Sequence, residues 1–391
     1  MTRAAQFLIG EVAAAGYRSL RSIRFPLRPL SVFVGANGTG KTNLYRSLQL
    51  VQAAASGTLS RMLAAEGGMD SALWAGKRSA RQPARIRLSV ILDSNGAPKP
   101  DDADPQLRYS YAVEIGTRAP VEAALPLEPL IKEETLTLRF RGRQTKLLER
   151  RGPARFARDL DGNRISLDDE LMASETALAA IEDPPRFPDL SVLRRTMLDW
   201  RFYHDFRTDA AAPLRQPYLA VTTPTLSSDA SDLAAVLATL VHIRGDTHDL
   251  DRTIEDAFPG ARLVVPAPGS TASFGMVYPE HPQRIFAASE LSDGTLRYLG
   301  LAGALLAYRL PALIALNEPE ASLHPELFAP LARLIAKAAE RTQVWAVTHS
   351  ERLAQLLTEQ SGVASMTVIK RAGETWIDGL RLGGGFADED E

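Results

Sequence analysis

Gly35-Ala36-Asn37-Gly38-Thr39-Gly40-Lys41-Thr42 decides the fold of this 391-residue chain, because it fits the pattern G-x-x-x-x-G-K-[ST]. The apolar segment Leu30 to Val34 precedes it and is predicted as a strand, whereas Asn43 to Ala55 follows it with helical spacing. A strand, a glycine-rich turn and a helix in this order are the context that the pattern requires. These flanking elements argue against a chance glycine turn and predict a phosphate-binding loop.

Each residue type in this loop suits the binding of phosphate. The glycines let successive backbone N–H groups point inward, and the positive end of the following helix adds to the anion site. Lys41 is expected to reach the β- and γ-phosphates, and the Thr42 hydroxyl is expected to ligate Mg²⁺. The predicted nucleotide-binding residues are Gly35, Ala36, Asn37, Gly38, Thr39, Gly40, Lys41, Thr42 and Asn43.

Composition limits the classes of protein that this chain can be. Its 45 basic and 47 acidic residues leave a net charge of −2, so any contact with nucleic acid must use a local patch. Because cysteine is absent, disulfides and thiolate metal sites are excluded, which agrees with a reducing cytoplasm. The apolar run Phe7 to Gly10 is too short for an export signal, and Arg309 and Pro311 interrupt the longest apolar stretch. We therefore expect a cytoplasmic protein without a membrane segment.

The first half of the chain is predicted to contain an antiparallel meander. Alternating apolar and polar residues indicate half-buried strands. The strands of the predicted meander are Arg85 to Asp93, Leu107 to Ile115 and Glu134 to Phe140, whereas Gly10 to Ala15 and Ser22 to Phe25 are predicted as short strands before the glycine-rich loop. Segments rich in proline and acidic residues, Asn95 to Pro105 and Pro120 to Pro129, are predicted loops.

The middle of the chain is predicted to be a compact insert of helices and strands. Helical segments run from Asp232 to Ile243 and from Asp249 to Phe258, and no heptad run predicts a long coiled coil. Aromatic residues recur with period two at Trp200, Phe202, His204 and Phe206. One face of a strand there would be aromatic, and we interpret it as a core face and not as a base-stacking platform.

The last hundred residues have an α/β pattern. The predicted elements are a helix from Gly294 to Tyr308, a strand from Ala312 to Leu316, a helix from Pro325 to Ala339, a strand from Gln343 to Val347 and a helix from Glu351 to Glu359. Parallel strands covered by helices are the expected result. The acidic end, Ala387 to Glu391, is predicted to be disordered.

The strand Ala312 to Leu316 ends in polar groups that resemble a Walker B motif. A carboxylate at this position can polarise a water for attack on a γ-phosphate, which is the predicted role of Glu318. Asn317 takes the place where an aspartate usually holds the Mg²⁺ shell, so the predicted metal-site residues are Thr42 and Asn317. Because Asn317 brings no negative charge, the sequence leaves the rate of turnover open.

The motifs together resemble the bacterial predicted ATPases related to SMC, RecF and OLD-type proteins. Leu291 to Thr295 is similar to the ABC signature, with Asp293 replacing the usual second glycine, and Asn317-Glu318-Pro319-Glu320 and Leu323-His324-Pro325 follow it. The resemblance implies an α/β P-loop NTPase of the ABC-ATPase head type, with a β-meander and a mixed insert between the Walker A and signature motifs. The resemblance implies that residues 1–141 and 289–391 together form the ATPase head and that residues 142–288 form an insert lobe.

The resemblance also implies a homodimer in which two subunits enclose two ATP molecules with Mg²⁺. The signature residues Ser292, Asp293, Gly294 and Thr295 of each subunit would face the ATP of the other. His349, at the end of the strand after Walker B, would sense the γ-phosphate, and His324 would contact the dimer partner or cap a turn. No Q-loop glutamine is assigned. Because no Toprim nuclease segment follows His349, a nuclease or other effector would be a separate chain.

A basic cluster lies in the middle of the chain and contains a single acid, Glu149. Its members are Arg139, Arg141, Arg143, Lys146, Arg150, Arg151, Arg155 and Arg158. Such a patch could follow the phosphate backbone of DNA. A solvated hairpin or a docking face for an acidic partner explains it equally well, so both interpretations stay open.

Two functions remain. The first is an ATP-hydrolysing dimer that drives work on DNA in repair, recombination or defence against phage. The second is a slow nucleotide-dependent switch that controls a separately encoded effector without binding DNA. A small-molecule kinase has no use for a signature motif and a switch histidine, and Asp293 and His324 depart from the pattern of ABC transporters.

Overall fold

The computed structural model describes residues 7–77, 84–94, 107–117, 127–167, 171–204 and 206–386. The chain forms two compact units: Met1–Arg28, Ala36–Trp200 and Thr367–Glu391 make the first, and Pro29–Gly35 and Arg201–Met366 make the second. The predicted boundaries at 141/142 and 288/289 do not coincide with the limits of these units. Of the predicted loops and tail, residues 95–105, 120–126 and 387–391 lie outside the described residues.

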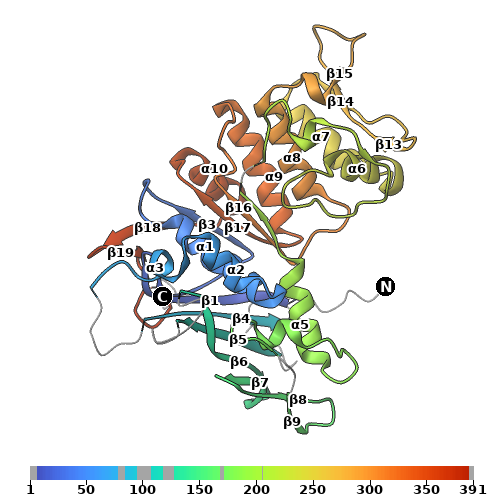
Figure 1. Cartoon of the computed structure of the whole chain (residues 1–391). Helices are drawn as coiled ribbons and strands as arrows, with labels where there is room; N and C mark the ends of the chain where they lie inside the picture. Colours follow the sequence, from blue (N-terminus) through green and yellow to red (C-terminus); the bar gives the residue numbers. More distant parts are fainter. Residues whose placement is uncertain are drawn as a thin grey trace. The chain divides into compact units, whose positions relative to one another are not determined.

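The first unit is built on an antiparallel sheet with the strand order β2-β1-β4-β5-β6-β7-β8-β9 (Figure 1). The predicted meander is therefore present, and it continues beyond residue 141 because β7, β8 and β9 pair onto its edge. The strands are β1 (Phe7–Tyr17), β2 (Leu20–Pro26), β4 (Arg85–Ser94), β5 (Arg108–Gly116), β6 (Leu130–Phe140), β7 (Arg143–Arg151), β8 (Ala154–Arg158) and β9 (Arg164–Ser166).

Helices pack against this sheet. Alternation along β4 buries Ile86, Leu88, Val90 and Leu92 on one face, and α1 (Lys41–Ser56) contacts β1, β4 and α5 (Pro188–Asp199). The shorter helices are α2 (Leu59–Ala65), α3 (Gly68–Ala72) and α4 (Ala177–Ala180). A hairpin of β18 (Met366–Arg371) and β19 (Glu374–Ile377) brings β19 against β2.

The second unit contains four parallel strands in the order β10-β16-β17-β3. These are β10 (Arg201–Tyr203), β16 (Leu313–Asn317), β17 (Gln343–Thr348) and β3 (Leu30–Val34), and helices α8 (Asp293–Leu306), α9 (Phe328–Ala339) and α10 (Glu351–Ser361) accompany them (Figure 1). Asn317 pairs with Val347, and Thr348 pairs with Val34. The carboxyl ends of β16, β17 and β3 therefore meet at one edge of the sheet.

The remainder of the second unit consists of short elements. The helix predicted from Asp232 to Ile243 is α6 (Leu233–Ala238) followed by a π-helical segment, Thr239–Arg244, and α7 covers His248–Ala257. Short 3₁₀ turns lie at Pro213–Arg215, Ala288–Glu290 and Pro325–Leu327. The small strands are β11 (Tyr218–Leu219), β12 (Arg262–Val264), β13 (Thr271–Ala272), β14 (Gly275–Val277) and β15 (Phe286–Ala287).

The aromatic segment is a core face, as predicted. Trp200, Phe202 and Phe206 are buried, although the strand β10 has only three residues. His204 differs because it is exposed just beyond the end of β10. It therefore ends beside the carboxyl terminus of the neighbouring strand β16.

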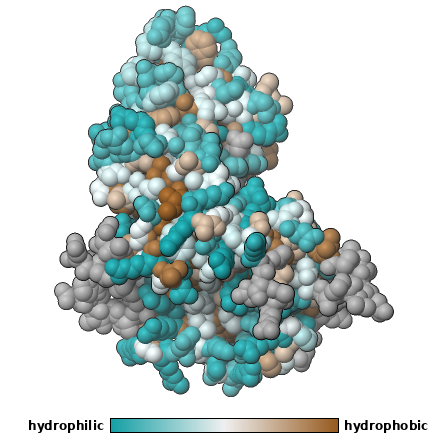
Figure 2. Space-filling view, turned by 90° about the vertical axis from the view of Figure 1, so that its left-hand side faces the viewer, coloured by the Kyte–Doolittle hydropathy of each residue, from teal (hydrophilic) through white to brown (hydrophobic). Residues whose placement is uncertain are grey.

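Apolar side chains are concentrated inside the units. In the second unit, Leu296, Leu299, Ile314 and Leu316 belong to one fully buried cluster. The face drawn in Figure 2 is largely hydrophilic or intermediate, with apolar residues in small separate groups. Among the described residues, no helix has both the length and the apolar character needed to cross a membrane.

Candidate functional site

The predicted phosphate-binding loop connects β3 to α1. Gly38 and Gly40 have φ values of 79° and 99°, in the left-handed region that glycine favours. A Cβ atom on Gly40 would lie 1.8 Å from Thr375 Oγ1 and 2.6 Å from Ser19 Oγ, so no larger residue fits. Thr375 Oγ1 also donates a hydrogen bond of 2.7 Å to the carbonyl oxygen of Thr39. Contacts from the β19 hairpin therefore hold this loop in shape.

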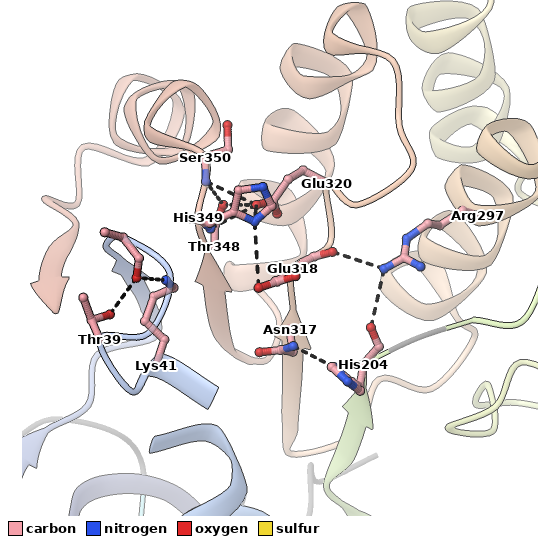
Figure 3. A network of polar contacts seen from close by, with 11 residues as sticks. Thr39, Lys41, His204, Arg297, Asn317, Glu318, Glu320, Thr348, His349 and Ser350 are labelled. Atoms are coloured by element: carbon pink, nitrogen blue, oxygen red, sulfur yellow. Dashed lines mark hydrogen bonds and ion pairs between the residues drawn. The ribbon is translucent and has the colours of Figure 1, made fainter. Parts of the chain in front are cut away.

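Lys41 is the first residue of α1 and is 5% exposed. Its Nζ donates a hydrogen bond of 2.9 Å to the carbonyl oxygen of Ala36, and Thr39 Oγ1 donates to the same oxygen at 3.0 Å (Figure 3). The ammonium group thus lies back against the backbone of its own loop. Thr42 follows at the second position of α1, whereas the Asn43 side chain donates to Ser19 Oγ at 2.7 Å.

Asn317, Glu318, Glu320 and His349, which we call the strand-end cluster, lie at the carboxyl ends of β16 and β17. The backbone N–H of Glu318 donates to the carbonyl oxygen of Val347 at 2.7 Å, and His349 Nδ1 lies 3.8 Å from Glu318 Oε1 (Figure 3). Glu318 has a φ of 49°, which costs a residue other than glycine about 1–3 kcal/mol. Its side chain is 37% exposed, so water can reach the carboxylate.

Glu320 is a functional candidate to which the sequence motifs assigned no role. Its carboxylate is 2% exposed and accepts hydrogen bonds from the backbone N–H groups of His349 at 3.1 Å and Ser350 at 3.3 Å, and from the hydroxyl of Thr348. His349 Nδ1 lies 3.3 Å from the same oxygen. A buried acid near the exposed Glu318 therefore organises the end of β17.

Arg297, on α8, is a second candidate to which the sequence motifs assigned no role. Its side chain is buried and its Nη2 donates to the carbonyl oxygens of Glu318 at 3.1 Å and His204 at 3.4 Å (Figure 3). One guanidinium group thus connects the signature helix to the ends of β16 and β10. The feature of the sequence that could have indicated Arg297 is that it is the one basic residue in a largely apolar predicted helix.

Asn317 is 2% exposed and its Nδ2 lies 2.6 Å from His204 Nδ1. Its Oδ1 is buried without a hydrogen-bond partner in the described part of the chain. A small cavity of about 10 Å³, lined by both residues and by Arg297, has room for about one water molecule. The amide oxygen of Asn317 is therefore an acceptor with unused capacity.

Mg²⁺ prefers oxygen ligands and commonly keeps several waters. The Thr42 hydroxyl in the first unit and the unpaired Asn317 Oδ1 in the second unit are each oxygen groups of this kind. Both groups are neutral, so an ion bound to either would depend on nucleotide phosphates for its charge balance. When bound, Mg²⁺ neutralises charge on the β- and γ-phosphates.

The signature residues Ser292 to Thr295 form the start of α8. Ser292 caps the helix, because its Oγ accepts from the backbone N–H of Thr295 at 3.2 Å. A Cβ on Gly294 would lie 3.1 Å from the carbonyl oxygen of Ser322, so a larger residue there would require Ser322 to shift by a few tenths of an ångström. Asp293 is paired with Arg215 at 2.6 Å. Further along the chain, His324 caps the turn Pro325–Leu327 through its side chain, which is 70% exposed.

The structure corrects one member of the basic cluster. Arg150 is 2% exposed and its guanidinium donates to the carbonyl oxygens of Glu175, Met172 and Ala173, so it cannot contact a nucleic acid. It instead ties the segment before α4 to β7. The exposed members are Arg139, Arg141, Arg143, Lys146 and Arg151, while Arg155 and Arg158 are half-buried.

A groove of about 570 Å³ lies on β7, β8 and β9. The cationic residues that line it are Arg143, Lys146, Arg158 and Arg164, and Glu149 is the acid in its lining. Arg164 lies 3.7 Å from the centre of the Phe156 ring, and Lys146 pairs with Glu149 at 2.9 Å. The groove adds Arg164 to the predicted basic residues and carries an excess of positive charge.

Comparisons with known proteins agree with this geometry. A family model described as "AAA domain, putative AbiEii toxin, Type IV TA system" matches residues 30–354. The solved structure of an Smc head bound to the C-winged helix domain of ScpA aligns with a TM-score of 0.55 at 14% identity, covering 96% of this chain and 99% of that one. An Smc head domain from Pyrococcus furiosus, with an extended coiled coil and bound to the C-terminal domain of ScpA, aligns with a TM-score of 0.51 at 13% identity, covering 96% and 97%. No curated protein matches the sequence.

These alignments confirm the predicted fold class, a P-loop fold of the ABC-ATPase type similar to SMC heads. At identities of this size the likeness concerns the fold. The parallel strands that carry the P-loop and the strand-end cluster, together with the antiparallel meander, are the features that the fold class led us to expect.

Proposed function

Since this chain belongs to the AAA-domain family whose model covers residues 30–354, we propose that it binds ATP at Gly35–Thr42 and hydrolyses it with Glu318 as the general base. The observation that carries the proposal is the register of the parallel strands. β17 pairs with β16, which ends before Glu318, and with β3, which leads into the loop at Gly35. The register therefore brings the acid and the start of the loop to the same sheet edge.

The residues divide the work as follows. Lys41 and the N–H groups of the loop bind the phosphates, and Glu318 takes a proton from the attacking water. His349 lies 3.8 Å from the Glu318 carboxylate and reports the presence of the γ-phosphate. Glu320 orients His349, and Arg297 holds the carbonyl oxygen of Glu318. The side chains that contact substrate are thus fixed by buried partners.

ATP binding is proposed to join two copies of the chain. The start of α8 presents Ser292 and Gly294 at a helix N-terminus, where the helix dipole favours an anion. This surface would complete the ATP site of the other copy. The ABC-type fold supports this arrangement, and the partner in it is a second copy of this chain.

Replacement of Glu318 tests the enzymatic proposal. Glu318→Gln should lower kcat about 10²- to 10⁴-fold, the usual contribution of a general base, while the Kd for ATP stays near the wild-type value. Glu326→Gln is a matched control, because Glu326 lies in the turn after Walker B with a side chain 88% exposed. Hydrolysis at the wild-type rate by Glu318→Gln would rule out Glu318 as the base.

The process that the ATPase drives is proposed to act on DNA, and the groove on β7 to β9 supports this choice. Its lining includes four cations and one acid, which suits a phosphate backbone. The neutral Asn317 favours the second candidate, a slow switch that controls a separate effector without contact with DNA. ATP hydrolysis measured with and without DNA separates the two, because only the first predicts stimulation.

A further inference from the structure

We propose that Arg215 is a positioning residue of the signature loop, the segment from Ser289 to Asp293 that leads into α8. Its guanidinium binds backbone carbonyl oxygens of this loop and neutralises the charge of Asp293. The inference rests on the proposed ATP-dependent dimer and says how the signature surface of that dimer is built. It also explains why this chain can carry an aspartate where the ABC signature has glycine.

The contacts of Arg215 converge on one short segment. Its Nη1 donates to the carbonyl oxygens of Ser289 at 3.1 Å and Leu291 at 2.8 Å, and its Nη2 donates to Asp293 Oδ1 at 2.6 Å. On its other side, Nε donates to the carbonyl oxygen of Thr208 at 2.8 Å. Arg215 thus bridges the residues after β10 and the segment that leads into α8.

Burial distinguishes this contact from an ordinary surface ion pair. The Arg215 side chain is 9% exposed, whereas exposed pairs contribute little to stability. Three backbone carbonyls and one carboxylate occupy a guanidinium whose donors have a fixed geometry. A lysine has a single ammonium group and could not reproduce this set. The site is therefore built for arginine.

Asp293 supplies the chemical reason. It is the first residue of α8, and its carboxylate is 61% exposed on the surface proposed to meet an ATP phosphate. An uncompensated carboxylate there would repel the phosphate of the facing copy. The Arg215 guanidinium at 2.6 Å removes that repulsion. The dipole of the signature helix can then act on the phosphate as it does with glycine in this position.

The test uses the full chain with Glu318→Gln, so that bound ATP persists, and measures two quantities: the Kd for ATP and the Kd for dimerisation with ATP and Mg²⁺. Arg215→Ala should weaken dimerisation at least about tenfold, because a charge-assisted contact is lost from each of two signature loops. The Kd for ATP should change less than about twofold, since the P-loop binds ATP in either copy alone. Arg215→Lys should fall between the wild type and Arg215→Ala.

Two further variants separate positioning from simple loss of structure. Asp293→Asn added to Arg215→Ala removes the unpaired carboxylate, so it should recover part of the dimerisation that Arg215→Ala loses. Arg284→Ala is the matched control: Arg284 pairs with Glu290 at 2.5 Å beside the same loop, but its side chain is 61% exposed. That control should dimerise like the parent.

The outcomes are distinct. If the Glu318→Gln parent does not dimerise with ATP, the proposed ATP-dependent dimer is wrong, and the proposed role of Arg215 in that dimer is overturned with it. If the parent dimerises and Arg215→Ala dimerises equally well, the inference about Arg215 is overturned. A loss in Arg215→Ala that Asp293→Asn deepens instead of relieving overturns the charge-cancelling role.

Discussion

The Glu320 carboxylate accepts a hydrogen bond from the backbone N–H of His349 at 3.1 Å and lies 3.3 Å from Nδ1 of the same residue. Because this carboxylate is 2% exposed, its position is fixed by the fold, whereas the histidine ring is 45% exposed. Glu320 therefore presents His349 toward solvent in one orientation, from the segment that also holds Glu318.

The first prediction follows from this pair. Glu320→Gln should lower kcat about tenfold or more, because the neutral amide orients His349 less firmly, with little change in the Kd for ATP. Since Glu320 acts through His349, the double variant Glu320→Gln with His349→Ala should be no slower than His349→Ala alone. Single-turnover hydrolysis measures each rate. Multiplied losses in the double variant would show that Glu320 acts independently of His349.

Lys41 is predicted to be required for nucleotide binding. Lys41→Ala removes the ammonium that bridges the loop at 2.9 Å from the Ala36 carbonyl, so the Kd for ATP should rise about 10²-fold. Titration with a fluorescent ATP analogue measures the change. Lys370→Ala, at an exposed position on β18, is the control and should bind normally. Equal binding by both variants would contradict the assignment of the loop.

Because Asn317 is neutral, we predict that the chain binds Mg²⁺ more weakly than a variant with aspartate at this position. Asn317→Asp adds a negative charge at the unpaired Oδ1 position, so the Mg²⁺ concentration needed for half-maximal ATP binding should fall about tenfold. A Mg²⁺ titration of ATP binding, monitored by fluorescence, gives this midpoint without depending on turnover. An unchanged midpoint would place Asn317 outside the metal site.

Much of this fold could be predicted from the sequence. The strand Leu30–Val34 was predicted to the residue, and the helix after the P-loop was predicted within two residues at its start, because apolar periodicity and glycine punctuation mark both ends. The strands β7 to β9 at one edge of the sheet were not predicted, since they carry charged residues on both faces. The prediction that Arg150 belongs to an exposed basic cluster was wrong. Its guanidinium is buried and donates to backbone carbonyl oxygens, and such partners leave no pattern in the sequence.

The candidate site was predicted only in part for a related reason. Motif spacing indicated Lys41, at the start of α1, and Glu318 and His349, which follow the ends of β16 and β17. Arg215 and Arg297 act on backbone carbonyls far away in the sequence, and a carbonyl oxygen is present in every residue. Partners of that kind become visible only when the chain is folded.

Glu134 is predicted to be a determinant of stability in the first unit. Its buried carboxylate accepts hydrogen bonds from Tyr111 Oη at 2.9 Å and from the backbone N–H groups of Ala177 and Leu178 at 2.6 and 3.0 Å. Glu134→Ala should lower the free energy of unfolding by roughly 3 kcal/mol, because these donors lose their partner. Glu133→Ala, at the neighbouring exposed position, should change it by less than about 0.5 kcal/mol.

The same residue gives a pH dependence with a defined sign. Burial raises the pKa of the Glu134 carboxyl above its usual range. The folded chain therefore keeps this proton to a higher pH than the unfolded chain, and the contribution of Glu134 to stability falls as the pH rises through that window. Urea unfolding at several pH values should show a smaller decline for Glu134→Gln. An identical pH profile would contradict the raised pKa.

The basic groove is predicted to bind DNA through its exposed cations. Reversal of Arg143, Lys146 and Arg164, which are exposed residues of its lining, to glutamate should weaken DNA binding and lower the salt slope by about three, close to one unit per lost phosphate contact. The matched control reverses three exposed arginines of the second unit, namely Arg262, Arg284 and Arg352, with the same change in net charge. Equal losses in both triple variants would show that bulk charge and not the groove binds DNA.

The molar mass of Glu318→Gln in the presence of ATP and Mg²⁺, measured by light scattering after gel filtration, tests the central claim most directly. We expect twice the monomer mass with ATP, and the monomer mass with ADP or when Lys41→Ala is added. A monomer with ATP bound, demonstrated by nucleotide recovery from the same peak, would contradict the ATP-sandwich dimer.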